Sequence, residues 1–147
     1  VHGLAHVAPI VAGDGPERQR LQAMATKNVR FTGWVTEDRA TELLAGSRGF
    51  IQASKEDFGI ATVEAQACGV PVLAYGEGGA LETVNTGPNP SGVYLQDLSP
   101  LPLAQAIDAF ARRSFRLEDC QANARRFSPE AFDAGLMHLI ESTLSAS

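Results

Sequence analysis

The chain has 147 residues, of which 44% are apolar and 20% are charged, and its formal net charge is −5. This composition is typical of one soluble globular domain whose core needs no disulfide or metal to stabilise it. The mild acidity and the lack of a lysine- or arginine-rich run argue against a nucleic-acid partner.

The chain carries few groups suited to redox or metal chemistry. Its two cysteines, Cys68 and Cys120, form no CxxC pair, which suits a reducing compartment, so we expect a cytoplasmic protein. Its three histidines are scattered without ligand spacing, so no metal site is expected. No stretch approaches the roughly 20 apolar residues of a membrane span, and no signal peptide is visible. Because the chain begins at Val1 rather than Met, we expect a domain of a longer protein.

Short apolar runs alternate with longer, mixed stretches along the chain. The apolar runs predict five strands, at Val7–Ala12, Val29–Thr32, Gly49–Ala53, Val72–Tyr75 and Gly92–Leu95. The remaining stretches predict six helices, at 16–25, 36–46, 60–67, 80–85, 101–113 and 128–144.

Four residues mark the ends of these helices. Pro16 is suited to be the first residue of its helix, and Thr36 to cap the next helix with its hydroxyl. Gly69 is expected just past the end of the third helix, and Ser128 at the start of the last.

The alternation of strands and helices is typical of an α/β protein with a doubly wound, Rossmann-like parallel sheet. We expect a single domain over residues 1–147, with about five strands flanked by helices. In such sheets ligands bind beyond the carboxyl ends of the strands. Four loops are predicted there, at 13–15, 33–35, 54–59 and 76–79.

The helix that begins near Ile60 predicts an anion site. Its first N–H groups, those of about Ile60 to Val63, are expected to have no partner within the helix. Together with the helix dipole they attract negative charge. Gly59 precedes them and lets the backbone approach a phosphate closely.

Two glutamates flank this helix start. Glu64 lies one turn into the helix, and its side chain leans toward the N-terminus, where it can accept hydrogen bonds from a ribose diol. Glu56 lies in the preceding loop, where it can accept hydrogen bonds from sugar hydroxyls. Each such bond contributes about 1.5–3 kcal/mol. Spacing alone does not decide this, because a solvated loop acid and a surface helix acid give the same pattern.

The residues around the two glutamates carry a more specific pattern. The run Glu-Asp-Phe-Gly-Ile-x-x-x-Glu-Ala-x-Ala-x-Gly-x-Pro-Val, followed by Gly-Gly-x-x-Glu, resembles the donor-binding signature of retaining glycosyltransferases of family four, or group 1. That family has two Rossmann-like domains. The stretches 11–17, 29–35 and 124–128 agree with the resemblance, which spans roughly residues 7 to 145. The variant found here looks most like the bacterial mannosyltransferases of polysaccharide assembly.

The resemblance implies a role for each position of the motif. Glu56 matches the catalytic-site glutamate that contacts the transferred sugar near the reacting carbon, and Glu64 matches the ribose-binding glutamate. Backbone N–H groups are implied to bind the remainder of the donor. Their positions are Phe58 and Gly59 for the sugar, Ile60 and Ala61 for the diphosphate, and Gly33, Trp34 and Val35 for the nucleobase.

Other residues are left with two interpretations. Trp34 either stacks on the base or packs at the rim of the site. Gly13 and Gly15 either line the same cleft or only form a turn. The pair Gly78 and Gly79, with Glu82, either borders the sugar or starts and caps a helix.

The resemblance implies transfer of a sugar, GDP-mannose being one candidate donor, from a nucleoside diphosphate to an acceptor hydroxyl of a polysaccharide or glycolipid, with retention at the anomeric carbon. No cofactor and no metal is expected, because the helix amides hold the diphosphate and no Asp-x-Asp is present. The Arg and Lys that the family places upstream are not found. The chain is therefore expected to be the C-terminal, donor-binding domain, inactive alone. An absent N-terminal domain would supply the acceptor site and any membrane contact.

Two rival functions remain open from the sequence. One is a nucleotide-sugar epimerase of the same fold. The other is a non-catalytic nucleotide or dinucleotide module. For the second, Gly13-Asp14-Gly15 is a G-x-G, but Arg18 stands where the dinucleotide fingerprint has glycine. The nucleobase, the sugar, the acceptor and the oligomeric state cannot be read from loops that act through their backbone.

Overall fold

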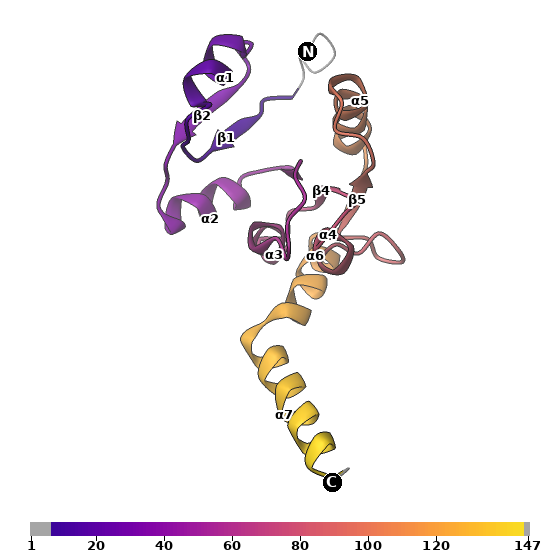
Figure 1. Ribbon diagram of the computed structural model, residues 1–147. Helices are drawn as coiled ribbons and strands as arrows, with labels where there is room; N and C mark the ends of the chain where they lie inside the picture. The colour runs from indigo at the N-terminus through magenta and orange to yellow at the C-terminus, as the bar shows by residue number, and fades with distance from the viewer. Residues whose placement is uncertain (1–6, 146–147) are drawn as a thin grey trace.

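The computed structural model describes residues 7–145, so the start at Val1 lies outside the described residues. The strands in this part of the chain are β1 (Ile10–Ala12), β2 (Arg30–Gly33), β3 (Phe50–Gln52), β4 (Val72–Tyr75) and β5 (Gly92–Leu95). The helices are α1 (Arg18–Met24), α2 (Glu37–Ala45), α3 (Ile60–Ala67), α4 (Ala80–Thr83), α5 (Pro100–Ala111), α6 (Leu117–Ala124), the 3-10 turn η1 (Arg125–Phe127) and α7 (Pro129–Ser145) (Figure 1).

All pairings between these strands are parallel, which confirms the predicted α/β class. The strands nevertheless form two sheets, β1-β2 and β3-β4-β5, rather than the single five-stranded sheet that we expected. A doubly wound sheet has the strand order 3-2-1-4-5-6. The order found here matches that scheme in two parts. Strands β2 and β1 correspond to positions 3 and 2, and strands β3, β4 and β5 correspond to positions 4, 5 and 6. No described strand occupies position 1, so nothing bridges β1 and β3.

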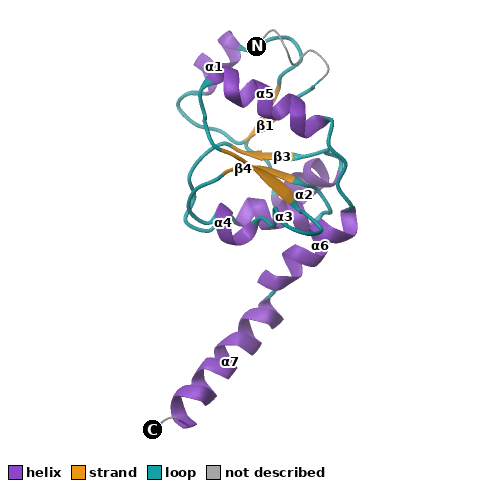
Figure 2. Cartoon of the chain, turned by 90° about the vertical axis from the view of Figure 1, so that its right-hand side faces the viewer, coloured by secondary structure: helices purple, strands orange, loops and turns teal. Residues whose placement is uncertain are grey.

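Helices cover both faces of the three-stranded sheet (Figure 2). On one face, Val72 and Ala74 of β4 pack with Ala65 of α3 in a buried cluster. On the other face, Leu73 packs with Phe110 of α5. Successive residues of a strand point to opposite faces, so β4, flanked on both sides by other strands, contributes to both clusters.

Most of the predicted helix ends are confirmed. The Thr36 hydroxyl accepts a hydrogen bond from the Arg39 N–H at 3.3 Å, and Gly69 has a φ of +78° just past α3. The expectation for Pro16 is wrong. A turn closed by the hydrogen bond from Arg18 N to Gly15 O, at 3.1 Å, holds Pro16 outside the helix, which begins two residues later.

Two helices near the C-terminus differ from the rest. Helix α6 was not predicted, because its stretch carries no clear start signal: Arg116 precedes it without a side-chain cap. Helix α7 extends away from the rest of the chain and buries none of its residues (Figure 1). No helix within residues 7–145 is both long and apolar enough to cross a membrane.

A buried polar network joins α3, α4 and α6. The Gln66 amide is fully buried and donates to the carbonyls of Thr62, at 3.0 Å, and Thr83, at 2.9 Å. Asn123 donates to the Gln66 side-chain oxygen at 2.6 Å and to the same Thr83 carbonyl at 2.8 Å. Thr83 ends α4, so its carbonyl would otherwise lack a partner. Arg126 donates to the Asn123 oxygen at 2.8 Å and completes the network.

We expect Asn123→Ala to lower the free energy of unfolding of the complete protein by about 2–3 kcal/mol, because buried hydrogen-bonding groups lose their partners. The matched control is Gln121→Ala on the same helix, whose one long hydrogen bond of 3.4 Å is exposed. Its effect should stay within about 0.5 kcal/mol. Equal losses in the two variants, measured by urea unfolding, would show that the network contributes no special stability.

Candidate functional site

The loops that follow β3 and β4 lie against each other. Glu56 forms a bridge with Gly78, and the Gly79 N–H donates to the Glu56 carbonyl at 2.8 Å. The structure therefore brings together two of the loops that the sequence predicted at the carboxyl ends of the strands.

This close approach requires glycine at both positions of the second loop. A Cβ at Gly78 would overlap the Glu56 carbonyl oxygen, and its φ of +62° is itself unfavourable for other residues. A Cβ at Gly79 would lie 2.5 Å from both the Asp57 oxygen and Phe58 Cα. Gly79 is also the N-cap of α4, which confirms the helix-starting interpretation of this pair.

An ion pair also links the two loops. Lys55 lies 3.5 Å from Glu77, and both side chains are exposed. The hydroxyl of Tyr75 donates to the other Glu77 oxygen at 2.9 Å. This hydrogen bond raises the pKa of Tyr75 above its ordinary value, since ionisation would place a phenolate beside a carboxylate.

The Glu56 carboxylate is held by two neighbours on its own segment. Its Oε1 accepts hydrogen bonds from Gln52, at 3.1 Å, and from Ser54, at 3.0 Å. Sequence reasoning missed both residues. The signal was present, because Gln52, Ser54 and Glu56 are spaced two apart, and alternate residues of an extended segment point the same way.

The start of α3 offers two free amides rather than the four expected. Gly59, with a φ of +82°, caps the helix. Its carbonyl accepts from the N–H groups of Thr62, at 2.9 Å, and Val63, at 3.3 Å. The expectation that the N–H groups of Thr62 and Val63 have no partner is therefore wrong. The N–H groups of Ile60 and Ala61 make no hydrogen bond within residues 7–145 and are available for an anion.

Glu64 is exposed on α3, and its carboxylate makes no hydrogen bond or ion pair with another described residue. Two residues further along, Gln66 points into the buried network, so α3 has one exposed acidic face and one anchored face. No group of three or more His, Cys, Asp or Glu residues suited to a metal ion is found within residues 7–145.

A second group of predicted residues lies on the two-stranded sheet. The Gly13 N–H donates to the Gly33 carbonyl at 2.9 Å, so these two loops also meet. Trp34 follows, with 75% of its surface exposed, and Val35 is half-buried. No hydrogen bond between described residues joins this group to the loops of Glu56 and Gly79.

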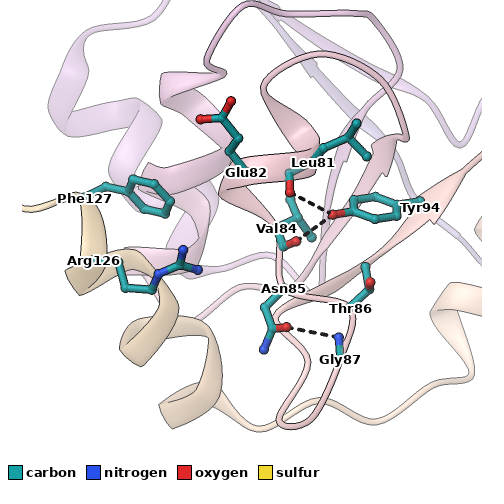
Figure 3. Close-up of a pocket in the computed structure, with 9 residues that line it drawn as sticks. All are labelled: Leu81, Glu82, Val84, Asn85, Thr86, Gly87, Tyr94, Arg126 and Phe127. Atoms are coloured by element: carbon teal, nitrogen blue, oxygen red, sulfur yellow. Dashed lines mark hydrogen bonds between the residues drawn. The ribbon is translucent and has the colours of Figure 1, made fainter.

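A separate cavity of about 430 Å³ lies beside α4 (Figure 3). It is lined by Glu82, Tyr94, Arg126 and others, but by none of the loop residues 54–59. Phe127 forms one wall and stacks edge-on against Phe58, with ring centroids 5.6 Å apart. Sequence reasoning did not assign a role to Phe127, since its partner lies 69 positions away in the chain.

The chain matches known proteins over most of its described length. A model of the family "Glycosyl transferases group 1" matches residues 3–113. A GDP-mannose-dependent monoacylated alpha-(1-6)-phosphatidylinositol monomannoside mannosyltransferase of Corynebacterium glutamicum is 35% identical over 118 residues. That alignment covers 71% of this chain and 31% of the relative, so the chain spans about a third of the relative's length.

Solved structures show the same fold. Sucrose-phosphate synthase of Thermosynechococcus elongatus superposes with a TM-score of 0.71 and 25% identity, covering 99% of this chain and 41% of that one. The Anabaena protein HepE, in complex with UDP and glucose, superposes with a TM-score of 0.68 and 25% identity, covering 90% of this chain and 40% of that one.

We expect Gly79→Ala to destabilise the protein by about 1–3 kcal/mol, because the added methyl meets the backbone of residues 57 and 58. The φ of Gly79 is −61°, so the backbone tolerates alanine and only the contact is tested. The control is Gly135→Ala, where a Cβ meets nothing within 4 Å. In a helix interior this control should stabilise by about 0.5–1 kcal/mol. The free energy of unfolding of both variants is measured in urea. An unchanged value for Gly79→Ala would contradict the close approach of the loops.

Proposed function

This chain belongs to the group 1 glycosyltransferases, and we propose that it binds the nucleoside-diphosphate sugar donor of such an enzyme. The observation that carries the proposal is the start of α3. Two free amides, of Ile60 and Ala61, follow the held carboxylate of Glu56 in the chain and precede the exposed carboxylate of Glu64. One anion-binding point flanked by two acceptors of hydroxyl hydrogen bonds fits a sugar, a diphosphate and a ribose in sequence.

In this proposal each group of the donor has a defined partner. The diphosphate binds the amides of Ile60 and Ala61 at the positive end of the α3 dipole. Glu64 accepts hydrogen bonds from the ribose diol. Glu56 accepts them from the transferred sugar, which also contacts the backbone N–H groups of Phe58 and Gly59.

The nucleobase is proposed to lie against the loop of Gly33, Trp34 and Val35. Trp34 supports this placement, because its indole is largely exposed and can stack on a base. Four further glycines of these loops, Gly13, Gly15, Gly78 and Gly79, would line the cleft.

The proposed reaction transfers the sugar with retention of the anomeric configuration. The bond between the anomeric carbon and the diphosphate oxygen breaks, a bond from that carbon to the acceptor oxygen forms, and the acceptor's proton passes to the leaving diphosphate. The amides at α3 stabilise the charge that develops on the leaving diphosphate. We propose no metal ion and no cofactor for this step.

The rest of the enzyme is proposed to lie beyond this chain, which covers about a third of its matched relative. An N-terminal domain would bind the acceptor and supply cations for the diphosphate. The similar proteins differ in the nucleotide, which is GDP for the Corynebacterium mannosyltransferase and UDP in the Anabaena complex. We propose GDP-mannose as the first donor to test and a polysaccharide or glycolipid as the acceptor class. The family match supports a transferase over an epimerase or a non-catalytic module.

Glu56→Ala and Glu64→Ala should affect different kinetic constants of the complete enzyme. Glu56→Ala removes contacts near the reacting carbon and should lower kcat by about 100-fold or more. Glu64→Ala removes ribose hydrogen bonds and should raise the donor KM by roughly 10–100-fold with a smaller effect on kcat. Glu118→Ala, on the exposed side of α6, is the control and should change neither. Unchanged kinetics in both site variants would refute the assignment.

A further inference from the structure

The side chain of Arg18 covers the Gly33 loop. A Cβ at Gly33 would lie 2.8 Å from Arg18 Nη1 and 3.2 Å from both Cζ and Nη2. Three atoms of the guanidinium group therefore lie over the one position in this loop that has no side chain. The φ of Gly33 is +72°, so its conformation also favours glycine.

Arg18 is held in this position from the other side. Its Nη1 donates to Asp14 Oδ2 at 3.0 Å, and Asp14 Oδ1 accepts from the Gly15 N–H at 2.9 Å. The loop of Asp14 and the loop of Gly33 are thus joined twice: by this side chain, and by the hydrogen bond from Gly13 N to Gly33 O.

The arginine is packed rather than freely solvated. Its Nε is buried and makes no hydrogen bond with the part of the chain that the structure describes. Burying such a donor costs free energy. The guanidinium group nevertheless lies beside Gly33, with Nη1, Cζ and Nη2 as the nearest atoms. An ammonium group has a single nitrogen and could not make the same three-atom contact.

The charge of Arg18 is already matched by Asp14, so Arg18 is not suited to replace the cations missing from the diphosphate site. It is also the first residue of α1, which lies apart from α3 in both views of the chain (Figures 1 and 2). The contact of Arg18 with Gly33 instead indicates a role in the loop that carries Trp34.

We propose that Arg18 is a positioning residue that fixes the Gly33-Trp34-Val35 loop and thereby sets the discrimination among nucleobases. This inference rests on the proposed function, in which that loop meets the base. The indole of Trp34 is 75% exposed, so its orientation depends on the backbone of the preceding glycine. Arg18 blocks one side of that glycine and limits the orientations of the loop.

The test measures dissociation constants of the complete protein for GDP, UDP and ADP by calorimetry. The readout is the ratio between the weakest and the tightest of the three constants. Arg18→Ala should reduce this ratio by about tenfold, since a misplaced loop loses base-specific contacts first. Arg18→Lys keeps the charge but not the planar group and should show most of the same loss.

Arg20→Ala is the matched control. Arg20 lies on the same helix, is exposed, and forms an ion pair with Glu17 rather than with Asp14. It should leave the ratio unchanged. If Arg18→Ala does not fold, the same ratio is measured in Arg18→Lys and in Asp14→Asn. The second of these variants breaks the ion pair with Arg18.

Three outcomes would overturn the inference. An unchanged ratio, with or without equal weakening of all three nucleotides, would show that Arg18 does not set base discrimination while leaving the proposed function intact. Full retention of the ratio in Arg18→Lys would show that the guanidinium contact with Gly33 does not set the discrimination, which overturns the inference as stated. Failure of the unaltered protein to bind any of the three nucleotides would overturn the proposed function and this inference with it.

Discussion

The candidate site depends on the contact between the loop of Glu56 and the loop of Gly78 and Gly79. The two loops lie close enough for a backbone hydrogen bond of 2.8 Å only because neither glycine carries a Cβ. That contact fixes the segment from Glu56 to Gly59, which leads directly into α3. The position of the free amides at α3 and the position of the Glu56 carboxylate, which we propose binds the sugar, are therefore set by the same glycine pair.

Buried groups of α3, α4 and α6, to which no ligand contact is assigned, support this contact between the loops. The Thr83 hydroxyl donates to the Gly79 carbonyl at 2.9 Å, and the Thr83 carbonyl accepts from Gln66 and Asn123. Both ends of the short helix α4 are thus tied to buried partners. Because Gln66 belongs to α3, hydrogen bonds connect the helix that offers the amides to the loop that borders them. Such preorganisation is what electrostatic stabilisation of a leaving group requires.

The sequence predicted those helices and strands whose ends are set by residues close to them in the chain. Strands β4 and β5 and helix α3 were predicted with their observed ends, because glycines and apolar runs bound them clearly. The free amides were overestimated, since the sequence does not reveal that the Gly59 carbonyl turns back to accept from Thr62 and Val63. The division of the described strands into two sheets was also missed, because apolar runs predict strands but do not show which strands pair.

Contacts between distant residues could not be predicted at all. The stacking of Phe58 on Phe127 and the cover of Gly33 by Arg18 join separate elements, and neither has a signature in its own segment. Arg18 shows this most clearly. In the sequence it counted only as a departure from a glycine fingerprint, whereas in the structure its guanidinium group lies beside the glycine that stands 15 positions later.

The central claim is that the amides of Ile60 and Ala61 bind the diphosphate of the donor. The most direct test is an amide NMR titration of the isotope-labelled complete protein with GDP and UDP. The account predicts that the signals of Ile60 and Ala61 show the largest shifts on saturation by the nucleotide that binds. The account would be contradicted if a nucleotide bound while these two signals stayed in place and those around Tyr94 and Arg126 shifted instead.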